Sequence, residues 1–76
     1  MSLGERIRQV GRIKCRDALL RRGLSAELAD RWCDAWEHEA DLRGWERTSE
    51  FWQTGRLWID AQITARRSPD AVLARR

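Results

Sequence analysis

The sequence predicts an all-α fold, a three-helix bundle with an N-terminal αα-hairpin and a short C-terminal helical turn. The only proline stands at position 69, so the chain before it contains no strong helix breaker. Strand signals are scarce, because there is no Tyr, only two Val, and no Asn-Gly or Asp-Gly turn. Apolar residues also recur at the spacing of amphipathic helices. We expect residues 1–76 to form a single small helical domain.

The first predicted helix covers residues 3–22. Its apolar residues share one face, which we expect to enter the core: Leu3, Ile7, Val10, Ile13 and Leu20. Arg21 and Arg22 complement the negative end of the helix dipole. Gly23 then supplies a residue that tolerates the left-handed conformation in which many helices end.

The second predicted helix covers residues 26–43, between an N-cap at Ser25 and a stop at Gly44. One face is a continuous apolar stripe of Leu28, Ala29, Trp32, Ala35, Trp36 and Ala40. The opposite face is mainly acidic and carries Glu27, Asp30, Arg31, Asp34, Glu37, His38 and Asp41. We expect the stripe to pack inwards and His38 to be solvated.

The third predicted helix covers residues 50–67, with Thr48 or Ser49 as its cap. Its apolar residues are Phe51, Trp52, Trp58, Ile59 and Ile63. Gly55 lies among them on the same face, so we expect a bulky side chain such as Trp32 or Trp36 to approach the backbone there.

A short helical turn is predicted over residues 69–74. Ser68, Pro69 and Asp70 provide a cap, a proline suited to the first helical position and an acidic residue in the first turn. We expect Arg75 and Arg76 at the end of the chain to be frayed.

Charge is distributed unevenly along the chain. Residues 1–22 hold seven basic and two acidic side chains, residues 23–50 three and eight, and residues 51–76 five and two. One interpretation is that the basic and acidic segments neutralise each other within the bundle. The alternative is a basic first helix that binds nucleic acid or, less favoured, a membrane surface. Its phosphate contacts would be Arg6, Arg12, Lys14 and Arg16.

Metal ligands are sparse in this sequence. A zinc site would need Cys15, Cys33, His38 and a carboxylate, and the chain has no Cys-x-x-Cys pair. The thiols of Cys15 and Cys33 could form a disulfide across the first hairpin. Helical angles place Cys15 off the core face of its helix, which points the two side chains apart. Two ordinary packed thiols are therefore the favoured interpretation.

Catalytic groups are equally sparse. The carboxylates of Asp30, Asp34 and Glu37 share one helix face, a pattern typical of a solvated surface rather than of acid–base catalysis. The chain has no glycine-rich phosphate loop and no paired nucleophile and base. We predict a protein that is not an enzyme and uses no metal, cofactor or small-molecule substrate.

A helix-turn-helix unit over the second and third helices is disfavoured. Ala40 and Gly44 have the spacing found at such turns, but the later position that must be buried falls on Glu50. Glu46 and Glu50 would also repel phosphates at the start of the recognition helix.

Tryptophan is the most unusual feature of the composition, with five residues in the chain. A core of Trp32, Trp36, Trp52 and Trp58 explains most of them, whereas Trp45 lies in a turn beyond the apolar stripe. Trp and Arg are enriched at interface hot spots. We therefore expect a protein-interaction surface, with a homodimer as the simplest assembly and a monomer with a satisfied core as the alternative. Its expected residues are Trp45, Trp52, Arg43 and Arg47.

A resemblance to other small proteins adds a context. The run Gly23-Leu24-Ser25-Ala26-Glu27, the Trp32-x3-Trp36-Glu37 spacing, Gly44 and the run from Phe51 to Ile59 look like small Arg- and Trp-rich proteins of actinobacteria and their phages. The resemblance covers residues 23–59 and implies a helical accessory protein. It transfers no site residues.

The predicted function is a non-catalytic protein–protein interaction module, for example a phage or mobile-element accessory factor that occludes or scaffolds a host protein. The alternative is a small nucleic-acid-binding protein. The N-terminus lacks a signal-peptide core and no run approaches the length of a membrane span, so we expect a cytoplasmic protein.

Overall fold

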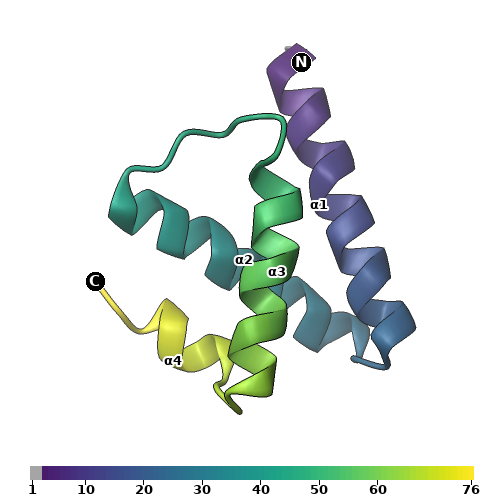
Figure 1. Ribbon diagram of the computed structural model, residues 1–76, viewed down its shortest axis with the longest axis vertical. Helices are drawn as coiled ribbons and strands as arrows, with labels where there is room; N and C mark the ends of the chain where they lie inside the picture. Colours follow the sequence, from purple (N-terminus) through teal and green to yellow (C-terminus); the bar gives the residue numbers. More distant parts are fainter. Residues whose placement is uncertain (1–2) are drawn as a thin grey trace.

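The computed structural model describes the backbone of residues 3–76 and the side chains within that range except those of residues 3–5, 7 and 8. The described residues form four helices and no strand. α1 and α3 lie side by side, α2 crosses behind them, and α4 lies against α2 (Figure 1). The predicted all-α fold, with its N-terminal hairpin and short C-terminal turn, is confirmed.

Helix α1 spans Leu3–Arg22, but a different face from the predicted one enters the core. Cys15 and Leu19 are buried, whereas Val10 and Ile13 are 51% and 57% exposed. The prediction for Leu3 and Ile7 concerns side chains outside the described part. The helix is rotated because α2 packs on the side that carries Cys15 and Leu19, where arginines of α1 pair with acidic residues of α2.

Helix α2 spans Ala26–Arg43 and forms the centre of the molecule, since α1, α3 and α4 all contact it. The Ser25 hydroxyl accepts a hydrogen bond from the Leu28 backbone N–H at 3.2 Å, as expected of an N-cap. Gly44 ends the helix in the left-handed conformation. The predicted stripe packs inwards apart from Leu28, which is exposed, and the buried set also includes Cys33 and Glu39.

Helix α3 spans Phe51–Thr64 and is shorter than predicted at both ends. Neither Thr48 nor Ser49 caps it; Glu50 occupies the cap position without a side-chain hydrogen bond, and the Phe51 backbone N–H donates to the Thr48 carbonyl instead. The helix ends early because Arg66 adopts a left-handed φ of 58°. The Arg67 N–H then donates to the Gln62 carbonyl, which closes the last turn.

Gly55 confirms the predicted close approach between α3 and α2. A Cβ at this position would lie 2.3 Å from Nε1 of Trp36. Trp36 itself is 1% exposed and contacts three further aromatic rings, those of Trp45, Phe51 and Trp58. The absence of a side chain at Gly55 therefore allows α3 to rest directly on the central indole.

Helix α4 spans Pro69–Leu73 and packs on α2, and Arg75, one of the two residues expected to be frayed, also contacts α2. Val72 is buried, and the Arg75 side chain pairs with the buried carboxylate of Glu39. The Nε2 atom of His38 lies 2.5 Å from the Arg75 carbonyl oxygen. His38 is half-buried by this contact and is not the solvated residue that the sequence predicted.

Candidate interaction surface

Ion pairs between α1 and α2 engage two of the four residues assigned to phosphate binding. Arg12 pairs with Asp34 at 2.7 Å and with Glu37 at 2.5 Å, and Arg16 pairs with Asp30 at 2.8 Å. Burial alone would lower the pKa of Arg12, but the hydrogen bond to Asp34 and the charge of Glu37 outweigh it and raise the pKa. Both guanidinium groups thus hold the hairpin together.

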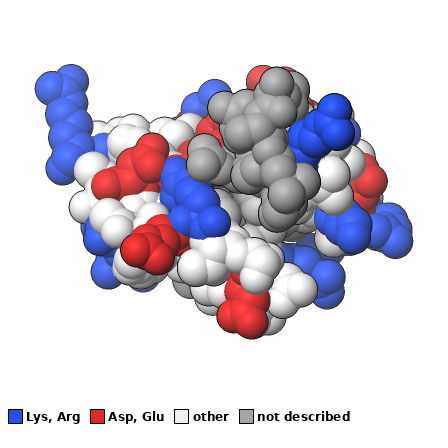
Figure 2. Space-filling view, turned by 90° about the horizontal axis from the view of Figure 1, so that it is seen from above, with Lys and Arg blue, Asp and Glu red and all other residues white. Residues whose placement is uncertain are grey.

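Arg6 and Lys14, the other two residues of that set, are exposed and make no ion pair with the described residues. On the face shown in Figure 2, acidic side chains lie among the basic ones, and several basic side chains stand at its edges. The described side chains on this face therefore mix both signs of charge, whereas a nucleic-acid backbone favours a continuous basic track.

The residues of the predicted Trp-centred patch belong to one aromatic cluster, most of which is interior. Trp45 is 44% exposed, lies 5.5 Å from the Trp36 ring and is covered by the Arg43 guanidinium at 5.2 Å. Arg47 lies over the Phe51 ring at 4.4 Å and pairs with Asp41 at 2.6 Å. Arg43 and Trp45 are the members of the set that face solvent.

Trp52, the remaining member, has a different position. It is 7% exposed and lies between α3 and α1, where a Cβ on Gly11 would be 2.5 Å from its Cδ1 atom. Gly11 therefore gives this indole room against the α1 backbone. Trp52 forms part of the wall of a groove rather than a protruding anchor.

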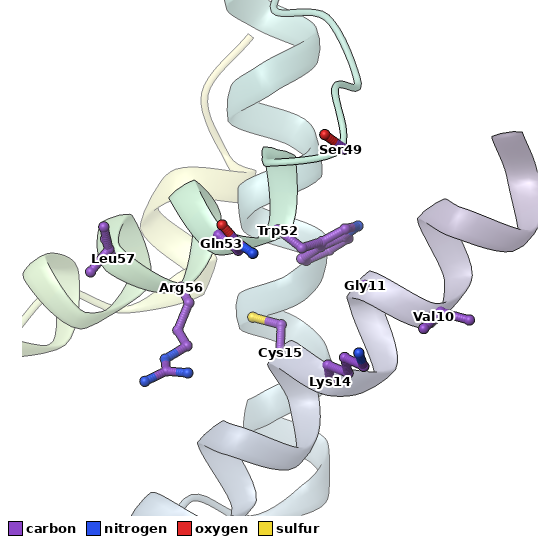
Figure 3. A pocket seen from close by; sticks show the side chains of 9 residues that line it. All are labelled: Val10, Gly11, Lys14, Cys15, Ser49, Trp52, Gln53, Arg56 and Leu57. Carbon is purple, nitrogen blue, oxygen red and sulfur yellow. The ribbon is translucent and has the colours of Figure 1, made fainter.

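A groove lies between α1 and α3 in the described part of the protein. It has a volume of about 560 Å³. Figure 3 shows the residues around it: Val10, Gly11, Lys14 and Cys15 of α1, Ser49 of the turn before α3, and Trp52, Gln53, Arg56 and Leu57 of α3. None of these residues is acidic.

Apolar side chains that lack a partner border this groove. Val10 is 51% exposed and Leu57 is 71% exposed, and both line the groove. Lys14 and Arg56 add positive charge from opposite walls, and neither makes an ion pair with the described residues. The result is an apolar groove with cationic rims.

The hydrophobic pattern of the sequence places Val10 and Ile13 in the core and gives no role to Leu57 or Arg56. The signal for Leu57 was present, because it is an apolar residue outside the stripe of Phe51, Trp58 and Ile59. No local signal revealed the rotation of α1, since that depends on which side faces α2.

No family model, curated protein or solved structure matches this chain. Within residues 3–76, no helix has the length and apolar character required to cross a membrane. The same part of the chain brings together no group of side chains suited to holding a metal ion.

Proposed function

We propose that this protein is a non-catalytic protein-interaction module whose docking site is the groove between α1 and α3. The observation that carries the proposal is that two exposed apolar side chains, Val10 and Leu57, line a groove that has no acidic wall. Apolar side chains exposed along a concave surface are typical of binding sites on small folded proteins.

The chemistry of the groove favours an acidic amphipathic helix as its occupant. The apolar face of such a helix would cover Val10 and Leu57, and its carboxylates would meet Lys14 and Arg56. Full burial of one large aliphatic side chain stabilises a complex by about 1.5–3 kcal/mol. The charges would mainly set specificity and the association rate. The module would act by occluding or scaffolding the protein that supplies the helix.

Selection from a displayed library of amphipathic helices tests this proposal, with constant leucines on one face and random residues on the other. We expect the wild-type protein to enrich sequences rich in Asp and Glu. Leu57→Asp should abolish this enrichment, because it places a carboxylate at the groove. Leu28→Asp, at an exposed leucine of α2 remote from the groove lining, is the matched control.

The Trp-centred patch that the sequence predicts is tested in the same experiment with the variant Trp45→Ala. If that variant loses binding while Leu57→Asp retains it, the docking site is the Trp45 surface and not the groove. If no variant and no wild-type sample enriches any helix, the proposal of a groove for helices is wrong. Light scattering on each variant separates self-association from binding to another protein.

A further inference from the structure

Two cysteines meet beneath the groove, on helices that form the first hairpin. Cys15 of α1 and Cys33 of α2 are free thiols, 3% and 0% exposed. The expectation that their side chains point apart is wrong, because the rotation of α1 turns Cys15 towards α2. The hydrogen bond between the thiols lowers the pKa of Cys15 and raises that of Cys33, and burial adds to the rise at Cys33.

The two thiols differ in their position relative to the groove. Cys15 is one of the residues that line the groove, and its sulfur is drawn pointing into the space between α1 and α3 in Figure 3. Lys14 and Arg56 line the same groove, and positive charge favours a thiolate. Arg12 also favours the thiolate of Cys15, whereas burial and, less strongly, Asp60 oppose it. Cys33 does not line the groove.

We propose that Cys15 is a site of oxidation by small peroxides and that Cys33 resolves the oxidised form into a disulfide between α1 and α2. This assignment does not depend on which partner occupies the groove. The class of oxidant follows from the burial of Cys15, which is 3% exposed at the groove. A small hydroperoxide reaches such a thiol more readily than a bulky disulfide does.

The proposed steps balance with hydrogen peroxide as the oxidant. The Cys15 thiolate attacks one peroxide oxygen, an S–O bond forms, the O–O bond breaks, and the departing hydroxide takes a proton from solvent to give water. Cys33 then attacks the Cys15 sulfur, so that an S–S bond forms and the S–O bond breaks. The hydroxyl group leaves with the Cys33 proton as a second water. The two thiols together lose the two electrons that reduce the peroxide.

Intact mass spectrometry of the full chain after exposure to hydrogen peroxide tests the proposal. We expect the wild-type protein to lose two hydrogens and to regain them with a thiol reductant. Cys33→Ala should stop at a sulfenic acid on Cys15 that dimedone traps. Cys15→Ala should form neither product under the same conditions. Circular dichroism identifies any variant that fails to fold, and Cys33→Ser and Cys15→Ser then replace it.

A second measurement separates access through the groove from access through global unfolding. Labelling of Cys15 by a small alkylating agent should not change with low concentrations of urea, whereas labelling of Cys33 should rise steeply as urea promotes unfolding. Arg56→Gln should slow the labelling of Cys15 severalfold by removing a nearby positive charge. Thr54→Gln is the control on the exposed face of α3.

The proposal is overturned if both thiols label only through unfolding, or if the wild-type protein exposed to peroxide shows no disulfide. It is also overturned if Cys15→Ala is oxidised at the wild-type rate, because Cys33 would then be the reactive thiol.

Discussion

At the scale of single residues, the contact between Gly55 and Trp36 defines how α3 packs on α2. A Cβ at position 55 would lie 2.3 Å from Trp36 Nε1, which is closer than nonbonded atoms approach each other. Trp36 is 1% exposed, so the indole has little room to move away. The low helix propensity of glycine is the cost of this contact.

We therefore predict that Gly55→Ala lowers the free energy of unfolding by about 1–3 kcal/mol, because the strain of overpacking exceeds the gain in helix propensity. Urea denaturation followed by circular dichroism measures the change. Thr54→Ala, at the exposed neighbouring position, should leave stability nearly unchanged. Combining Gly55→Ala with Trp36→Phe should recover part of the loss, since it removes the nitrogen that the new methyl group would meet. An equally stable or more stable Gly55→Ala protein would contradict the packing described for this site.

Among the described residues, Arg66 is the non-glycine residue that has a positive φ. Its φ of 58° closes the C-terminus of α3, a position that glycine occupies at lower steric cost. Arg66→Gly should raise the free energy of unfolding by about 0.5–1 kcal/mol. Arg66→Ala should give no such gain, because alanine also bears a Cβ. Thermal denaturation of the two variants and the wild-type protein measures the difference in stability.

At the scale of elements, the short helix α4 packs on α2 and fixes the C-terminal segment against it. Pro69 and Val72 are buried, and the Arg75 side chain contacts the Glu39 carboxylate at 3.4 Å. Glu39 is only 3% exposed and also pairs with Arg43 at 2.6 Å. A five-residue helix is too short to be stable alone, so its packing on α2 must maintain it.

We predict that Val72→Ala lowers the free energy of unfolding by about 1–2 kcal/mol, within the range of truncations of buried aliphatic side chains. Hydrogen exchange should show faster exchange in α4 and near His38 while the rest of α2 stays protected. Ala71→Ser, at an exposed position of the same helix, is the control. An unchanged hydrogen-exchange rate in α4 would mean that Val72 does not hold α4 against α2.

At the scale of the whole molecule, the sequence was sufficient to predict the helices but not which face of α1 points into the core. The bounds of α2 follow from Ser25 and Gly44, which act locally and can be recognised locally. The inward side of α1 depends instead on Arg12 and Arg16, whose long side chains reach the carboxylates of α2 while their stems pack against it. A hydrophobic pattern treats such residues as surface, so it assigned Val10 to the core and missed the groove.

The same ion pairs lead to a prediction about nucleic acids. If α1 bound phosphates, Arg12 and Arg16 would have to leave Asp34, Glu37 and Asp30. We expect the double variant Arg12→Gln/Arg16→Gln to unfold about 1 kcal/mol more easily, given the modest strength of partly exposed ion pairs. Its affinity for a DNA duplex at low salt, measured by fluorescence anisotropy, should change no more than that of Arg76→Gln, which removes a charge from an exposed position without an ion pair to the described residues. A selective loss of affinity in the double variant, with a shallower salt dependence, would favour the nucleic-acid function over the groove.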